Sequence, residues 1–321
     1  MSEAAVQISE IVKSFGNTKA LDGVSFEIPK SGVFGLLGPN GAGKTTMFSL
    51  MAGFLKPTAG KIEVLGINVE EISELRGRLS ILPQDAQFAA NVPIIEQIIF
   101  FSQLSGRTRQ EAEKEAEKAL AIVGLAEAAK KSARTLSHGM HKRLGIAQAF
   151  LGEPQVILLD EPTAGLDPAS AQGIRDLIER LRTSATLIVS SHNLAEIQKM
   201  CDMVAILDRG HLVTCESVKN ITQSDSIQRM TFARPLTDAE LAAVRGVTGV
   251  TGVDAEAAMG GNAAYRISYD ATSTGRTLEQ ITAEIVQALV ATGAVPRSIE
   301  DGVALESKFL EVTTAPIPRN N

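Results

Sequence analysis

Short apolar runs alternate with amphipathic stretches through the first 220 residues of the chain. The apolar runs have the length of strands, and their alternating or continuous hydrophobic character predicts half-buried or fully buried strands. The predicted strands are Val6–Ile11, Val24–Ile28, Gly32–Leu37, Val156–Leu159 and Thr186–Ser190.

Apolar residues recur at helical spacing between these strands, which predicts amphipathic helices. The first helix follows from Thr45, and its predicted buried face consists of Met47, Leu50, Met51 and Phe54. Further helices are predicted over Arg109–Val123, Leu144–Leu151 and Ile174–Leu181. Strands that alternate with helices predict an α/β core built on a largely parallel sheet.

The pattern changes after about Lys219, where the chain becomes rich in Ala, Thr, Val and Gly. The predicted elements there are a strand at Gln228–Ala233, a helix at Asp238–Val244, strands at Val247–Asp254 and Ala264–Tyr269 joined by a turn at Met259–Asn262, a helix at Leu278–Thr292 and a strand at Ala294–Ile299. This βαββαβ order predicts a small α+β, ferredoxin-like domain. We therefore expect one domain over residues 1–220, a second over 221–313 with a short helix at Leu305–Val312, and a flexible tail over 314–321.

Composition and charge exclude several classes of protein. The net charge is −6 without a block of like charges, so nucleic-acid binding through bulk electrostatics is not expected. Cys201 and Cys215 fit neither metal-ligand spacing nor a secreted disulfide framework, which indicates a reduced, cytosolic protein. We expect no signal peptide and no membrane helix, because the longest apolar segment, Val92–Phe101, is interrupted by Glu96 and Gln97.

The segment from Gly38 to Thr45 reads GPNGAGKT and matches the P-loop pattern G-x-x-x-x-G-K-[ST]. The apolar strand before it and the amphipathic helix after it favour a phosphate-binding loop over a glycine-rich turn of similar sequence. Lys44 is expected to reach the β- and γ-phosphates, and Thr45 to ligate Mg²⁺. The candidate nucleotide-binding residues of this loop are Gly38, Pro39, Asn40, Gly41, Ala42, Gly43, Lys44, Thr45 and Thr46.

Two adjacent carboxylates end the apolar strand VILLDE. Neighbouring strand residues point in opposite directions, so Asp160 and Glu161 need not have the same role. We expect Asp160 to belong to the Mg²⁺ shell and Glu161 to orient and deprotonate the attacking water. A solvated strand end is the alternative, which the P-loop upstream makes less favourable.

Together with Leu136–Met140 (LSHGM), these motifs make residues 4–220 resemble an ABC transporter ATP-binding subunit. LSHGM is similar to the LSGGQ signature of that family, which lies at a helix N-terminus and caps the γ-phosphate bound by the other subunit. The resemblance implies that Ser137 and Gly139 are the donors. His138 and Met140 depart from the motif, and a surface histidine at a helix start is the alternative to a role for His138 at the phosphate.

Four further residues occupy family landmarks. The resemblance assigns Gln84 to the Q-loop, which senses Mg²⁺ and water, and Asp167 to the D-loop, which bridges the dimer. His192 resembles the switch histidine that contacts the γ-phosphate, and Phe15 the aromatic residue that stacks on adenine. The resemblance thus implies Lys44, Gln84, Glu161 and His192 as catalytic residues, and a metal set of Thr45, Gln84 and Asp160.

The resemblance also implies the fold and the partners. It predicts a P-loop NTPase core of ABC type with an antiparallel β subdomain and a helical subdomain, and two copies packed head to tail around two MgATP. Membrane-spanning permease subunits would bind these copies at the inner face of the cell membrane. The segment LESKFLEVT and the C-terminal extension resemble those of the ABC-2 exporter branch, but nothing in the sequence reports the cargo.

Two other functions are alternatives to a transporter subunit. A soluble ABC ATPase acting on ribosomes or DNA usually carries two cassettes or a long coiled-coil insertion, and this chain has neither. A non-catalytic binding module is disfavoured by the full set of Lys44, Asp160, Glu161 and His192.

The apolar segment after Gln84 is a candidate docking surface for the membrane subunit. Ile94, Ile95, Ile98 and Ile99 are expected to point inward, which leaves Phe88, Val92 and Phe101 as candidates for exposure. The alternative is that all of these residues pack internally. The resemblance implies that a short helix of the membrane subunit binds there.

Overall fold

The computed structural model describes residues 4–222, 227–259, 262–270 and 275–301, in two compact units that divide between Ser217 and Val218. The predicted helix at Leu305–Val312, the tail at 314–321 and the tip of the predicted turn at Met259–Asn262 lie outside the described residues. Over the part of the chain that is described, no helix combines the length and the apolar character needed to cross a membrane.

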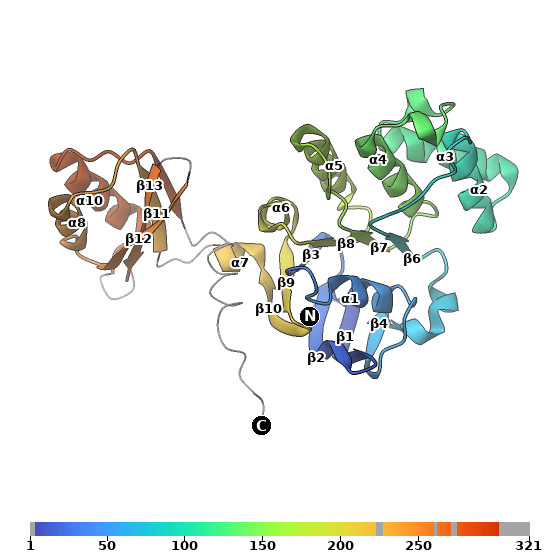
Figure 1. The fold of residues 1–321 in the computed structure, drawn as a ribbon, viewed down its shortest axis with the longest axis horizontal. Coiled ribbons are helices and arrows are strands. Elements are labelled where there is room, and N and C mark those ends of the chain that lie inside the picture. The colour runs from blue at the N-terminus through green and yellow to red at the C-terminus, as the bar shows by residue number, and fades with distance from the viewer. Residues whose placement is uncertain (1–3, 223–226, 260–261, 271–274, 302–321) are drawn as a thin grey trace. The chain divides into compact units, whose positions relative to one another are not determined.

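The first unit contains a four-stranded sheet, a six-stranded sheet and the helices α1 to α6 (Figure 1). The four-stranded antiparallel sheet has the order β2-β1-β4-β5, and the six-stranded sheet has the order β10-β9-β3-β8-β7-β6. The strands are β1 (Ala4–Phe15), β2 (Thr18–Pro29), β3 (Val33–Leu37), β4 (Ala59–Val64), β5 (Ile67–Asn68), β6 (Leu79–Leu82), β7 (Val156–Asp160), β8 (Thr186–Ser191), β9 (Met203–Asp208) and β10 (His211–Ser217). The helices are α1 (Lys44–Met51), α2 (Ile94–Leu104), α3 (Arg109–Ile122), α4 (His138–Ala149), α5 (Pro168–Leu181) and α6 (Leu194–Met200).

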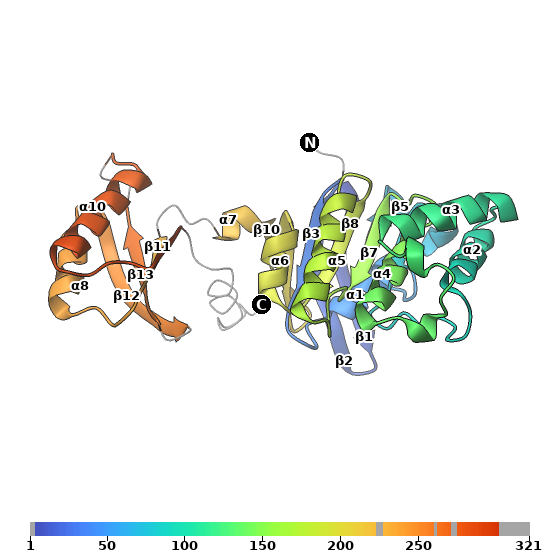
Figure 2. The same cartoon turned by 90° about the horizontal axis from the view of Figure 1, so that it is seen from above.

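The six-stranded sheet is largely parallel, as predicted. β3 pairs in parallel with β8 and β9, and β7 pairs in parallel with β6 and β8. Every residue of β3, β7 and β8 is buried, which is typical of parallel strands that are covered on both faces. One face carries α1 and the antiparallel sheet, while α4, α5 and α6 lie on the other (Figures 1 and 2).

Helix α1 packs between the two sheets, and its buried residues are Met47, Phe48, Leu50 and Met51. The prediction that Phe54 belongs to this face was wrong. The helix ends at Met51, Gly53 turns the chain at a φ of 70°, and Phe54 is left 66% exposed. The helical spacing continues in the sequence beyond the point where the helix itself stops.

Two helices begin earlier than their apolar pattern indicates. Helix α4 begins at His138, six residues before the predicted Leu144, and α5 begins at Pro168, six residues before Ile174. The first turn of α4 contains one large apolar residue, Met140, and that of α5 contains none, so hydrophobic periodicity does not mark them. The capping residues do, because the side chains of Ser137 and Asp167 accept hydrogen bonds from backbone N–H groups of these turns.

The second unit has its own hydrophobic core and its own sheet. After the short helix α7 (Val218–Thr222) come β11 (Ile227–Phe232), α8 (Asp238–Arg245), β12 (Val250–Met259), β13 (Asn262–Tyr269), α10 (Leu278–Ala291) and β14 (Ser298–Asp301). The antiparallel sheet has the order β12-β13-β11-β14, and Met230, Ile267, Tyr269, Ile281 and Ile285 are fully buried around it. This element order agrees with the predicted order, although β12 begins three residues after the predicted Val247 and β14 four residues after the predicted Ala294.

We predict that a chain ending at Ser217 folds and binds ATP, because both sheets of the first unit and all candidate phosphate-binding residues precede that point. Circular dichroism and equilibrium binding of a fluorescent ATP analogue test this, with the full chain as control. An insoluble product would show that the two units depend on a shared core.

Candidate active site

The P-loop connects β3 to α1, and only glycine fits at two of its positions, Gly43 and Gly38. Gly43 caps the helix with a φ of 106°, and a Cβ there would lie 2.7 Å from Leu21 Cδ2 and 2.8 Å from the Ala20 carbonyl oxygen. A Cβ at Gly38 would collide with the carbonyl oxygen of Leu207. The loop therefore packs tightly against Leu21 and Leu207, and it also lines a cavity.

That cavity has a volume of about 370 Å³ and contains most of the predicted nucleotide-binding residues. Phe15, Asn40, Gly41, Gly43, Lys44, Thr45, Thr46, Gln84 and Glu161 line it, together with Thr18, Lys19 and Ala20. The last three were missed, although they follow Phe15 by only three to five residues in the β1–β2 hairpin. Gly38, Pro39 and Ala42 belong to the loop but are not among the described lining residues.

Phe15 has the exposure that a stacking residue needs. Its side chain is 49% exposed at the edge of the cavity, and the Lys13 ammonium lies 5.0 Å from the ring centroid. An exposed aromatic ring, backbone N–H groups and an ammonium around one cavity fit a base and its phosphates.

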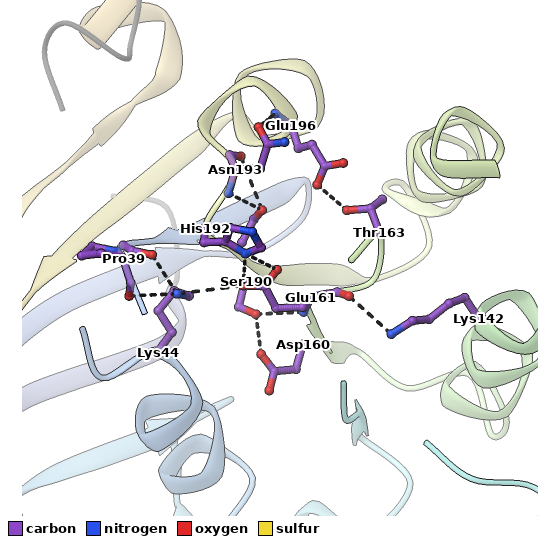
Figure 3. A network of polar contacts seen from close by, with 12 residues as sticks. Pro39, Lys44, Lys142, Asp160, Glu161, Thr163, Ser190, His192, Asn193 and Glu196 are labelled. Carbon is purple, nitrogen blue, oxygen red and sulfur yellow. Dashed lines mark hydrogen bonds and ion pairs between the residues drawn. The ribbon is translucent and has the colours of Figure 1, made fainter. Parts of the chain in front are cut away.

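Lys44 is buried and held among carbonyl groups of its own loop (Figure 3). Its Nζ donates to the Gly38 oxygen at 2.7 Å and the Pro39 oxygen at 3.2 Å, and lies 3.9 Å from Glu161 Oε1. Burial lowers the pKa of the Lys44 ammonium, while the carboxylates of Glu161 and Asp160 oppose that shift. An ammonium so poorly solvated interacts strongly with any anion that enters the cavity.

The two carboxylates at the end of β7 have different surroundings. In the parallel pairing of β7 with β8, Asp160 lies opposite Ser190, whose hydroxyl donates to Asp160 Oδ1. Burial raises the pKa of Asp160, and the Ser190 hydrogen bond opposes the shift. Glu161 instead faces the cavity, with both carboxylate oxygens 3.0 Å from His192 Nδ1 (Figure 3). His192 is more than half exposed and is not among the described lining residues of the cavity.

The backbone of Glu161 adopts a conformation that is unfavourable for a residue with a Cβ. Its φ is 48°, which costs about 1 kcal/mol or more relative to ordinary backbone. Its N–H donates to Ser190 Oγ at 2.9 Å, and its carbonyl accepts from the Ala164 N–H at 3.2 Å. Ser190 thus contacts both the Asp160 carboxylate and the Glu161 backbone. Sequence analysis missed this role, although Ser190 directly precedes the SHN run at the end of a buried strand.

The residues present fit a magnesium ion that is held jointly with a phosphate ligand. Thr45 and Gln84 line the cavity, while Asp160 is buried and is not among the lining residues. No group of three or more His, Cys, Asp or Glu side chains among the described residues could hold a metal by itself. Mg²⁺ commonly takes one or two protein ligands and completes its shell with water and substrate phosphates.

The signature residues lie at the start of α4 and outside the described lining of this cavity. Ser137 Oγ accepts a hydrogen bond from the Met140 N–H, and a Cβ on the buried Gly139 would approach Ser170 Oγ to 3.0 Å. His138 is exposed. Its Nε2 lies close to Gly165, since a Cβ built on that glycine would be 3.4 Å away. Asp167 caps α5, and hydrogen bonds, chiefly from the Ser170 side chain, lower its pKa.

The predicted docking segment differs from expectation in several residues, although Val92 is exposed as predicted. Ile94, Ile98 and Ile99 are buried as predicted, but Ile95 is half-buried and the polar Gln97 occupies the buried face of α2. Phe101 is half-buried, with its ring centroid 6.4 Å from that of Phe88, whereas Phe100 is 56% exposed. Gln97 fits inside because its amide bonds the Ala89 N–H at 2.7 Å and the carbonyls of Ala89 and Val92 at 3.1 and 2.9 Å.

Comparison with known proteins gives matches to a single family that include this unit. The family model described as "ABC transporter" matches residues 21–164. The linearmycin resistance ATP-binding protein LnrL of Bacillus subtilis is 33% identical over 253 residues, 77% of this chain and 81% of that protein. The bacitracin transport ATP-binding protein BcrA of Enterococcus faecalis is 33% identical over 244 residues, 75% of this chain and 77% of that protein.

Among solved structures, cbiO1 from Clostridium perfringens, described as part of the ABC transporter complex cbiONQ, has a TM-score of 0.64 and 28% identity. The match covers 68% of this chain and 91% of cbiO1.

We predict that Glu161→Gln lowers the rate of ATP hydrolysis by about 10² or more, because the amide keeps the shape of the side chain but cannot accept the proton of water. ATP affinity should stay within a few-fold of the parent, measured by equilibrium binding. Glu117→Gln, on the exposed side of α3, is the matched control and should leave turnover unchanged. Turnover near the parental rate in Glu161→Gln would remove Glu161 from the role of base.

Proposed function

Because this chain belongs to the ABC transporter family as an ATP-hydrolysing subunit, we propose that two copies bind head to tail around two MgATP and drive transport through separate membrane subunits. Each copy would contribute its P-loop cavity to one ATP and its LSHGM segment to the other.

The observation that carries this proposal is the position of the signature residues. The cavity contains base-stacking, phosphate-binding and water-orienting candidates, but Ser137 and Gly139 are not among its described lining residues. Both lie at the N-terminus of α4, where backbone N–H groups and the helix dipole favour an anion. A second chain is the natural source of the phosphate that such a helix end would bind.

Within one chain, different side chains then have different roles in ATP binding and hydrolysis. Lys44 and the P-loop amides hold the phosphates, while Phe15 stacks on the base. Glu161 orients and deprotonates the water, and His192, already bonded to Glu161, keeps that carboxylate aimed into the cavity. Thr45, Gln84 and Asp160 hold Mg²⁺, which neutralises charge on the phosphates when it is bound.

The names of the relatives support outward transport. One is named for resistance to linearmycin and another for transport of bacitracin. An outward pump confers resistance by lowering the concentration of a toxic compound inside a cell. We propose the same direction for this chain, with the membrane subunits choosing the cargo.

Mixed dimers test the head-to-tail arrangement. Lys44→Ala and Ser137→Arg should each abolish hydrolysis, yet an equal mixture should regain up to about a quarter of parental activity, because half of the dimers would combine one intact P-loop with one intact signature. ATPase assays on separate and mixed chains, with differently tagged copies to verify mixed dimers, give the measurement. An inactive mixture despite mixed dimers would contradict an action of Ser137 on the other chain's nucleotide.

The docking surface gives a second prediction. Phe100 is exposed on α2, next to the half-buried pair Phe88 and Phe101, and offers apolar area to a helix of the membrane subunit. Phe100→Ser should leave ATPase of the isolated chain nearly unchanged and reduce co-purification with the membrane subunit. Val295→Ser, at an exposed apolar residue of the second unit, is the control. Unchanged co-purification for Phe100→Ser would place the docking surface elsewhere.

A further inference from the structure

Lys142 is a buried lysine inside the signature helix, and its charge is directed toward the active site rather than into solvent. It lies five residues after the capping Ser137 on α4, and the residue is 8% exposed. Its Nζ donates to the carbonyl oxygen of Gln84 at 2.7 Å and lies 3.5 Å from the carbonyl oxygen of Glu161 (Figure 3).

Both acceptors belong to residues with an expected role at the water and the metal. Gln84 follows β6, and Glu161 follows β7, so α4 reaches two separate loops of the core through one side chain. For Glu161 this contact adds to the hydrogen bonds of its N–H with Ser190 Oγ and of its carbonyl with Ala164. The donors together hold the peptide groups on both sides of a residue whose φ of 48° is otherwise unfavourable.

An ammonium at this position is costly, which argues against simple packing. Burial lowers the pKa of Lys142, and the carboxylates of Asp85, Asp160 and Glu161 offset part of that shift. An apolar side chain of similar length would fill the same space without desolvating a charge. It would leave two carbonyl groups with fewer donors and the Glu161 carboxylate with one fewer positive charge nearby.

We propose that Lys142 is a positioning residue for hydrolysis, which sets the backbone of Gln84 and Glu161 and so aims their side chains at the water and the metal. This inference rests on the proposed roles of those two residues. It assigns no direct contact between Lys142 and the nucleotide.

The proposal gives α4 a second role in the dimer. The N-terminus of α4 would face the nucleotide of the other chain in the head-to-tail arrangement, while Lys142 on the same helix contacts the backbone carbonyl of Glu161 in its own chain. A shift of α4 when its signature binds phosphate would therefore alter the aim of Glu161 in its own cavity.

Lys142→Met tests the proposal, because methionine keeps much of the length and removes both hydrogen bonds. We expect kcat to fall by about tenfold or more while KM for ATP changes by less than about threefold, since the nucleotide contacts are untouched. Lys142→Arg can still donate to the carbonyls and should recover a large part of kcat. Lys114→Met makes the same substitution at an exposed lysine of α3 and should match the parent.

Three results would overturn the proposal: a kcat for Lys142→Met within twofold of the parent, no recovery in Lys142→Arg, or a loss of kcat that only parallels a loss of ATP-binding sites. The number of ATP-binding sites and the thermal unfolding midpoint of each variant identify the last case. Glu161→Gln is assayed beside them. If Glu161→Gln remains active, the assigned role of Glu161 fails; if it is inactive while Lys142→Met turns over normally, only the role of Lys142 fails.

Discussion

The parallel pairing of β7 with β8 is the constraint on which the active site depends. It places Asp160 opposite Ser190 at the point where both strands end, and it places Glu161 one residue later, where the chain leaves the sheet. Both strands are buried along their whole length, so neither can slide without moving its apolar side chains out of the core. A hydrophobic requirement thus fixes the positions of two carboxylates and a hydroxyl.

Positive and negative side chains lie close together around the end of β7. Two carboxylates, Asp160 and Glu161, lie near two ammonium groups, Lys44 and Lys142, in a region with little water. Burial lowers the pKa of both lysines and raises the pKa of Asp160, and the opposite charges counteract these shifts. The balance is made by residues far apart in the sequence, which meet because the P-loop, α4 and β7 converge on one edge of the sheet.

Sequence alone predicted those parts of the molecule that depend on neighbouring residues. The P-loop, the DE pair after β7 and the alternation of strands and helices are local patterns, and the residues proposed from them around the cavity lie within a short distance of one another. Phe54 was misplaced because helical spacing does not report where a helix stops. The role of Gln97 was not foreseen because a polar residue is buried only when the fold supplies its partners. Ser190 and Lys142 depend on contacts between distant segments, which no local pattern encodes.

The amide of Gln97 helps to link three segments of the first unit. Its hydrogen bonds hold the loop from Ala89 to Val92 against α2. Backbone hydrogen bonds join the same loop to the segment just before the signature, from the Arg134 N–H to the Ala90 carbonyl and from the Ala133 N–H to the Val92 carbonyl. These hydrogen bonds connect the three segments, so a displacement of α2 would be transmitted through them to the residues that precede Ser137.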